Sequence, residues 1–146
     1  MFESTLATTA DADLILKLYE LRTEATMREA RAWMNGRFFP QTADEFFAVM
    51  SARTAPENAW FRQVMSYWDM AAAFVLHGAL NAELFVDCTT EPFFLYAKFQ
   101  PLLPEIRKKM PHFLTKVEQV VEQSPTALAK VQQASKNLAA MQAAMK

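Results

Sequence analysis

Apolar and polar residues alternate with helical spacing along most of this chain. In its first part, apolar residues recur at intervals of four, three and four positions: Leu14, Leu18, Leu21 and Ala25. That spacing places one apolar stripe along a helix. Asp11 and Asp13 are candidate N-caps, and the pair Asn35-Gly36 is typical of a helix end. The pattern predicts a first helix over Asp11–Met34.

The longest apolar run, residues 60–86, predicts the helix around which the chain is organised. Its apolar positions follow steps of three and four residues, and they occur nearly all round the helix, as expected for a helix enclosed by neighbours. Gly78 is expected to kink or end this helix, and Asn81 to cap a short continuation. The most apolar part, residues 70–86, is shorter than the roughly 20 residues that span a bilayer. We therefore expect a buried helix and no membrane segment.

Capping residues and prolines divide the rest of the chain into shorter helices. The expected shorter helices cover residues 43–51, 81–87, 93–109, 112–123 and 126–146. Thr42 and Glu45 have the spacing of a capping box for the first of these. Pro92 suits the first turn of the third, and Pro101 and Pro104 predict that the third is kinked or broken and restarted.

These patterns predict an all-α fold: a single-domain bundle of about six or seven helices around a buried central helix. A length of 146 residues with 52% apolar residues is typical of one domain with one core. The two Gly argue against a fold rich in hairpins. Within this single domain over residues 1–146, we expect residues 1–10 to be flexible and residues 126–146 to form a C-terminal helix.

The last segment, residues 126–146, differs from the rest because it has no aromatic and no acidic residue. Its apolar residues alternate at four and three positions: Ala127, Val131, Ala134, Leu138, Met141 and Met145. Such a heptad-like seam of small side chains suits either the last helix of the bundle or a contact with a second copy. Self-association as a homodimer through this helix is therefore one expectation.

The charge pattern bears on partners and on location. Basic residues gather in one region that contains few acidic residues. They are Lys98, Arg107, Lys108, Lys109, His112 and Lys116. Such a cluster suits phosphates or an acidic partner, but the acidic residues near the N-terminus, Glu3, Asp11 and Asp13, are able to meet it within the protein. A solvated face is the expectation. A net charge of −1 favours neither nucleic acid nor an anionic membrane. The single cysteine, Cys88, and the absence of a signal peptide are typical of a cytoplasmic protein.

The sequence has few motifs that suggest catalysis or metal binding. The two Gly lie too far apart for a phosphate-binding loop, and there is no nucleophile elbow. Glu83, Asp87 and Glu91 are close in sequence but lack the histidine that a di-iron bundle needs, and Cys88 has acidic neighbours rather than basic ones. We expect no catalytic residue, no cofactor and no metal site.

Asp69 is the polar residue in the least expected place. It lies inside the apolar run, and an unpaired buried carboxylate is too costly to persist. One interpretation is a buried ion pair that holds two helices in register, with a partner among these residues: Arg22, Arg28, Arg31, Lys98 and Arg107. The other is an aromatic and acidic pocket for a cationic ligand, formed by Asp69 with Trp60, Tyr67 or Trp68.

His77 follows Asp69 by eight residues, so the two lie about 80° apart around the helix and about 12 Å apart along it. They cannot touch, but they are able to line one cavity at two heights. The alternative is that each is hydrogen-bonded separately in a helical core. The candidate ligand-binding residues are therefore Tyr67, Trp68, Asp69 and His77.

A combination of residues over 60–109 resembles a known pattern. The residues are Trp68, Asp69, Gly78, Leu80, Leu84, Lys98, Pro101, Pro104 and Arg107. Their arrangement is similar to that of small all-helical bacterial proteins classed only as a domain of unknown function. The resemblance implies an all-helical fold, and it implies no activity, cofactor or site residue.

The favoured function is a non-enzymatic protein-interaction or structural module that contacts a protein partner or a second copy of itself. The alternative is a small-molecule-binding protein or an enzyme with a pocket around Asp69. The two functions differ in what surrounds Asp69. A basic side chain that pairs with Asp69 and fills the space beside it favours the first function, and an empty cavity beside Asp69 favours the second.

Overall fold

Most helices of the protein begin and end where capping residues and prolines predict. The computed structural model describes residues 2 and 5–145, and within them the chain forms nine α-helices, one 3₁₀-helix and no strand. The helices are α1 (Thr9–Arg22), α2 (Ala25–Gly36), α3 (Ala43–Ser51), α4 (Pro56–Leu76), α5 (Ala82–Cys88), α6 (Glu91–Phe99), η1 (Gln100–Leu102), α7 (Leu103–Lys109), α8 (Thr115–Gln123) and α9 (Pro125–Ala144). The all-α bundle is confirmed, and the number of helices is close to the six or seven expected.

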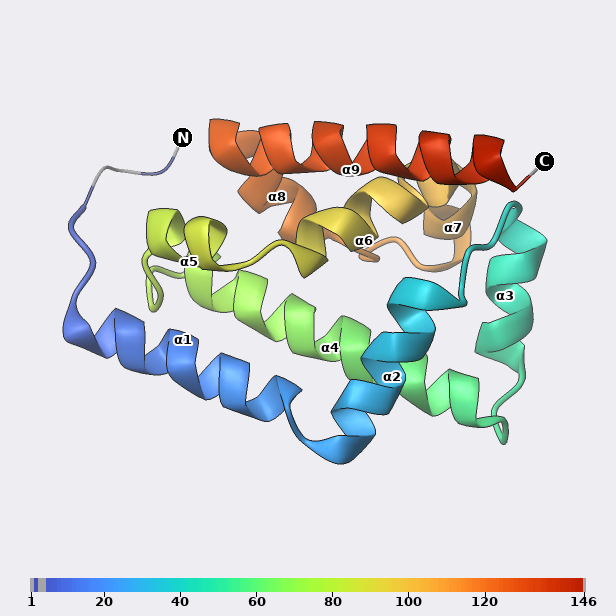
Figure 1. The fold of residues 1–146 in the computed structure, drawn as a ribbon, viewed down its shortest axis with the longest axis horizontal. Helices are drawn as coiled ribbons and strands as arrows, with labels where there is room; N and C mark the ends of the chain where they lie inside the picture. The colour runs from blue at the N-terminus through green and yellow to red at the C-terminus, as the bar shows by residue number, and fades with distance from the viewer. Residues whose placement is uncertain (1, 3–4, 146) are drawn as a thin grey trace.

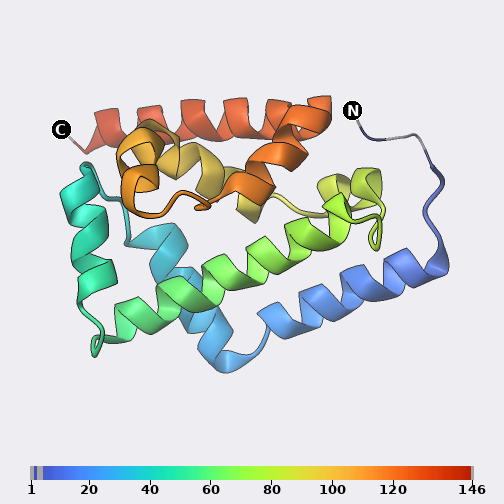
Figure 2. The same ribbon diagram turned by 180° about the vertical axis from the view of Figure 1, so that it is seen from behind.

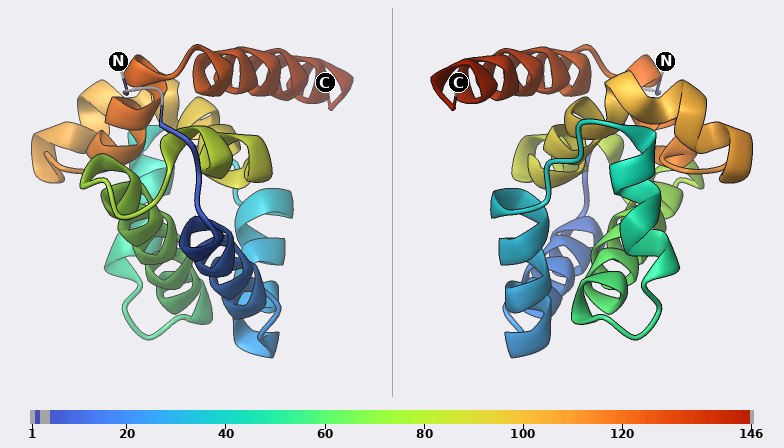
Figure 3. Two further views of the ribbon diagram at one scale, coloured as in Figure 1. Left: turned by 90° about the vertical axis from the view of Figure 1, so that its left-hand side faces the viewer. Right: turned by 90° about the vertical axis from the view of Figure 1, so that its right-hand side faces the viewer.

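The two edges of the bundle are α1 and α9, which lie on opposite sides of α4 and α6 (Figures 1 and 2). Views along the long axis show the same separation of α1 from α9 (Figure 3). Helix α4 packs against α2, α3, α5 and α8, while α6 packs against α8 and α9. One edge of the fold is therefore formed by the first helix of the chain and the other by the last.

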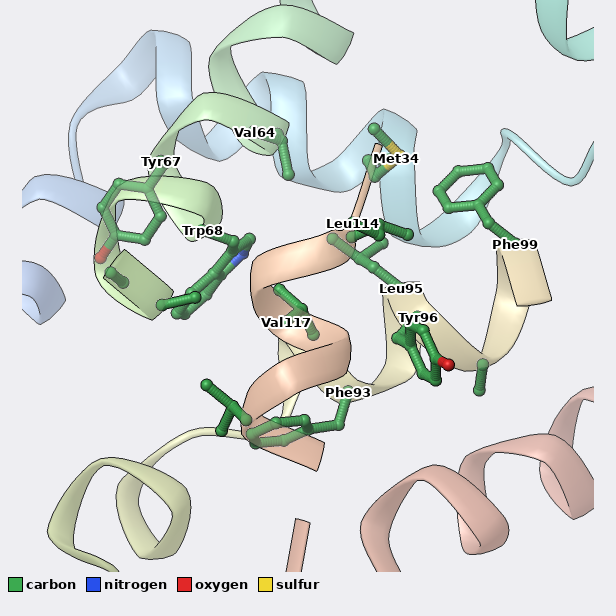
Figure 4. Close-up of a cluster of buried hydrophobic side chains, with 14 of the residues drawn as sticks. Met34, Val64, Tyr67, Trp68, Phe93, Leu95, Tyr96, Phe99, Leu114 and Val117 are labelled. Carbon is green, nitrogen blue, oxygen red and sulfur yellow. The ribbon is translucent and has the colours of Figure 1, made fainter. Parts of the chain in front are cut away.

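Helix α4 is the buried central helix that the apolar run predicts, and α6 shares this position. Eight residues of α4 are buried, and so are seven of the nine residues of α6. Figure 4 shows Val64, Tyr67 and Trp68 of α4 among side chains from α6 and α8. The core is thus built around these two helices, and α8 packs against both of them.

The expected first helix over residues 11–34 is wrong, because α1 ends at Arg22 and α2 begins at Ala25. Glu24 is the N-cap of α2, and its carboxylate accepts a hydrogen bond from the Met27 amide at 3.0 Å. Thr8, rather than Asp11 or Asp13, caps α1, and Asp11 completes the capping box from the third position. Glutamate is a less common cap than Ser, Thr, Asp or Asn, which is why the break was not predicted.

The glycine and proline signals are confirmed. Gly78 has φ of 78°, a left-handed conformation that ends α4, and Asn81 caps α5 by accepting from the Leu84 amide. The segment with Pro101 and Pro104 is broken after Phe99 into α6, η1 and α7. The next helix begins at Thr115, later than the expected 112, because a turn over 111–114 precedes it.

Most of the seam of the last segment lies inside the fold, although Met145 at its end is exposed. Ala127, Val131, Ala134 and Leu138 are buried, and α9 packs along α6. In the structure, the C-terminal segment is the last helix of the bundle. A contact with a second copy would have to use the outer face of α9, where Leu128 is exposed.

Part of the segment expected to be flexible is bonded to the fold. The Thr5 carbonyl accepts a hydrogen bond from the Asn81 side chain at 3.0 Å, and Thr8 caps α1. Residues 1, 3 and 4 lie outside the described residues.

Across the residues described, no helix combines the length and the apolar character needed to cross a membrane.

Candidate functional site

The four candidate ligand-binding residues do not share a cavity. Tyr67 and Trp68 are buried in the core, Asp69 is half-exposed on another face of α4, and His77 is exposed just after the helix ends. Figure 4 shows Tyr67 and Trp68 packed among buried side chains. The predicted aromatic and acidic pocket is therefore not formed by these four residues.

Asp69 has a lysine partner, and none of the predicted partners. Its carboxylate lies 3.3 Å from Nζ of Lys116 on α8, and 48% of its side chain is exposed. The prediction of a buried carboxylate is wrong, because Asp69 points along the surface between α4 and α8 rather than into the core. An ion pair with this exposure contributes about 0–1 kcal/mol to stability.

A groove of about 480 Å³ lies beside Asp69, between α4 and the turn that precedes α8. Its apolar wall is formed by Phe61, Met65, Met110, Phe113, Leu114 and Val117, and its polar wall by Arg62, Ser66, Asp69 and His112. Leu114 has φ of 60°, the left-handed region that non-glycine residues rarely adopt. The groove is large enough for a small molecule and has one carboxylate at its edge.

Tyr67 and Trp68 have structural hydrogen bonds. The Tyr67 hydroxyl donates to the Leu18 carbonyl and so joins α4 to α1. Burial raises the pKa of Tyr67 to about 12, so this hydroxyl stays protonated. The Arg22 guanidinium lies 5.3 Å from the centre of the Trp68 ring, in cation–π geometry. These contacts connect helices, and both residues are more than 90% buried.

Glu91 is the most highly connected charged residue, and the sequence analysis did not single it out. Its side chain is 9% exposed and forms an ion pair with Arg31, with 2.9 Å to both Nε and Nη2. It also accepts hydrogen bonds from Asn35 at 2.8 Å and from Trp68 Nε1 at 2.6 Å. One carboxylate therefore joins α2, α4 and α6. No local signal predicts it, because Arg31 lies 60 positions away in the sequence.

The expected basic cluster is dispersed. Lys98 is buried, whereas Arg107 pairs with Glu118 and Lys108 pairs with Glu105. Asp11 is not near these residues, because it accepts a hydrogen bond from the Asn81 amide at 2.9 Å. The expected neutralisation by the acidic N-terminal residues is therefore wrong for Asp11, and Glu3 lies outside the described residues.

Lys98 is 8% exposed, and its ammonium group donates to the carbonyls of Met34 and Phe38 at the end of α2. Burial lowers the pKa of Lys98 to about 7, while the charge of Glu91 opposes that shift. A lysine within the apolar segment 93–99 is the signal that could have identified it, by the reasoning applied to Asp69.

Exposed apolar side chains gather on and beside α1. Leu16 is 64% exposed and Tyr19 is 60% exposed, and Leu21 and Met70 are also exposed. Leu21 and Met70 border a second groove, of about 420 Å³, between the α1–α2 junction and α4. The predicted apolar stripe is right for Leu14 and Leu18 and wrong for Leu21 and Ala25, which are exposed. Sequence reasoning also missed the apolar outer face.

Metal-ligating groups do not converge in the part of the chain that the structure describes, where no three His, Cys, Asp or Glu side chains are placed to hold an ion. Cys88 is exposed at the end of α5 and has no disulfide partner. Glu91, which the sequence placed near Glu83 and Asp87, points into the core instead.

The comparison with protein families identifies the chain. The model of the family described as domain of unknown function DUF4760 matches residues 7–124. The chain belongs to this family. The match covers α1 through α8 and stops one residue before α9 begins. No curated protein and no solved structure matches the chain.

Membership in the DUF4760 family confirms the resemblance seen in the sequence and brings no activity with it. The matched region contains Glu91, Lys98 and the exposed face of α1. It ends before the seam of α9, although that seam covers α6 in this chain.

Proposed function

We propose that the protein is a non-enzymatic helical module that binds a protein partner through the outer face of α1. The observation that carries the proposal is that Leu16 and Tyr19 lie on the outer face of α1 and are 64% and 60% exposed, whereas Leu18 on the inner face is buried. Large exposed apolar side chains that lie next to one another are typical of surfaces that bind a partner. This helix is covered on one side only, so its outer face suits a partner.

The exposed side chains are of the kind that interfaces use. Leu16 and Tyr19 lie three positions apart on the outward face of α1, a spacing that matches one face of a helix. The Arg22 guanidinium lies 5.3 Å from the centre of the Tyr19 ring, which restricts the ring before binding. Tyrosine is enriched at protein interfaces because it buries a large apolar area and keeps a polar group.

The partner surface that fits best is an amphipathic helix of another protein. Such a helix would lie along α1 and cover Leu16 and Tyr19 with its apolar side, while Lys17 and Glu20 on α1 meet charges at the rim. The groove beside Leu21 and Met70 would accept one further apolar side chain. Burial of Leu16 and Tyr19 would contribute about 2–4 kcal/mol before the costs of association.

The experiment compares proteins captured by three forms of the full chain. The test variant carries Leu16→Glu and Tyr19→Glu, and the control carries Leu128→Glu on α9, at the opposite edge of the fold. All three positions are exposed, so circular dichroism should show the same helical content and thermal midpoint. A partner that wild type and control retain and the test variant loses at least tenfold supports the proposal; equal recovery by all three forms contradicts it.

A second candidate function is the binding of a cationic small molecule in the groove beside Asp69. Its volume of about 480 Å³ lies within the usual range for ligand sites, and its walls are mainly apolar with few polar groups. A thermal-shift screen of amines should yield hits that Asp69→Asn loses and that Glu105→Gln, a surface control, retains. Hits of equal size in both variants would exclude Asp69 as the recognition group.

Self-association through α9 is a separate proposal, supported only by the exposed Leu128 on its outer face. Removal of α9 would uncover α6, so a truncated chain is a poor test. Light scattering on the full chain and on Leu128→Glu is cleaner. A dimer that the substitution converts to monomer supports the proposal, whereas a wild-type monomer or an unaffected dimer excludes it.

A further inference from the structure

Lys98 lies in an unusual environment for a charged side chain. It projects from α6 toward the end of α2, where its nitrogen donates to two backbone carbonyls, those of Met34 and Phe38. Aromatic rings surround it, and the nearest ring centres are those of Phe39 at 4.9 Å and Phe99 at 5.0 Å. Among the described residues, no carboxylate lies within 4.0 Å of this nitrogen.

The two carbonyls accept both N–H groups of a neutral amine. A neutral amine has two N–H groups and one lone pair, whereas an ammonium has a third N–H that needs its own acceptor. Burial without a counter-ion lowers the pKa of Lys98 from 10.5 to about 7, so about half of the molecules carry the neutral form near neutral pH. Desolvation of this kind is one of the ways in which lysine is activated as a nucleophile.

The side chain also borders a cleft. A hollow of about 210 Å³ lies between α6, the C-terminal half of α9 and the segment that joins α2 to α3. Its lining includes the apolar residues Phe39, Pro40 and Leu138 and the polar residues Gln41 and Gln100. Lys98 is therefore buried and also lines the wall of a cleft.

We propose that Lys98 is a nucleophilic amine that forms an imine with small aldehydes entering this cleft. The lone pair of Nζ attacks the carbonyl carbon and forms the C–N bond. The carbonyl oxygen takes up both amine protons in turn and leaves as water, so that amine and aldehyde give imine and water with no change of oxidation state. A protonated imine keeps one N–H, which can donate to the Phe38 carbonyl. The apolar wall suits a short alkyl tail on the aldehyde.

The test uses the full-length protein, propanal and sodium cyanoborohydride, which reduces an imine to a stable secondary amine. Peptide mass spectrometry then gives the labelling rate of each lysine. At pH 7, Lys98 should react at least about tenfold faster than the exposed Lys17 and Lys136, because a lysine of ordinary pKa is almost fully protonated there. The rate at Lys98 should level off above pH 8, whereas the rates at exposed lysines should keep rising.

A pair of substitutions on α9 tests the route. Ala139 lines the cleft, and Ala140 is its exposed neighbour outside it. Ala139→Trp should reduce labelling of Lys98 at least fivefold and leave Lys17 unchanged, while Ala140→Trp should alter neither. The proposal is overturned if Lys98 reacts no faster than the exposed lysines at pH 7, or if Ala139→Trp leaves its rate unchanged. Either result would leave Lys98 as a structural cap for α2.

Discussion

Replacing Glu91 by Gln removes one negative charge at the point where α2, α4 and α6 meet. The substitution keeps the size of the side chain and changes one carboxylate oxygen into an amide group. In the native protein, Oε1 accepts from Arg31 and Asn35, while Oε2 accepts from Trp68. If the amide oxygen keeps the first position, the new NH₂ faces the Trp68 N–H, and two donors oppose each other.

The magnitude follows from these bonds. A buried donor left without an acceptor costs about 1–3 kcal/mol, and breaking a buried ion pair costs about 3–5 kcal/mol. Arg31 keeps 29% of its side chain exposed, so water can solvate part of its unpaired charge. We therefore expect Glu91→Gln to lower the free energy of unfolding by about 3 kcal/mol, a large share of the 5–15 kcal/mol typical of a domain.

Urea unfolding followed by circular dichroism measures this difference. Glu105→Gln is the matched control, because Glu105 pairs with Lys108 on the surface and should change stability by less than about 0.5 kcal/mol. In a Trp68→Phe background, the cost of Glu91→Gln should fall by about 1 kcal/mol, since the opposing donor is gone. If Glu91→Gln lowers the free energy of unfolding by less than about 1 kcal/mol, the conclusion that Glu91 holds the three helices together is refuted.

Three further predictions concern stability. Tyr67→Phe should cost about 1 kcal/mol, because the buried Leu18 carbonyl loses its donor, and urea unfolding measures the loss. Because the folded pKa of Lys98 is about 7 against 10.5 in the unfolded chain, the unfolded state binds more protons between these values, so the free energy of unfolding should rise from about pH 7 to pH 10. Lys98→Met should flatten that rise, and an unchanged slope would contradict the origin given. Gly78→Ala should cost about 1–2 kcal/mol because φ is 78°. Gly36→Ala, at the last residue of α2 and with open space around it, should be neutral or stabilising by up to about 1 kcal/mol, and thermal midpoints that move together would exclude this difference.

Much of the fold could be predicted from local signals. Some residues act on the backbone within one turn of their own position, so their effects can be predicted from the sequence alone. These residues are Gly78, Asn81, Pro92, Pro101 and Pro104. The break between α1 and α2 was missed because Glu24 caps the second helix, and glutamate is also a good residue for a helix interior.

The candidate site was much less predictable. Asp69 and Glu91 are both carboxylates next to apolar residues, yet Asp69 is half-exposed and Glu91 is nearly buried. The difference depends on which face of each helix meets a neighbour and on partners that are distant in sequence. Composition and spacing describe one helix at a time, so they cannot rank such residues.

By itself, the sequence determined the all-α class, the central helix over the apolar run and most helix ends, because these follow from helical periodicity and from the backbone limits of glycine and proline. Only the tertiary structure decided which polar groups meet: Glu91 with Arg31 and Trp68, Lys98 with the end of α2, and Asp69 with Lys116. It also decided that α9 covers α6 and that the outer face of α1 stays uncovered. Those outcomes depend on how helices pack against one another, and the free energy of packing belongs to pairs of surfaces rather than to any one segment.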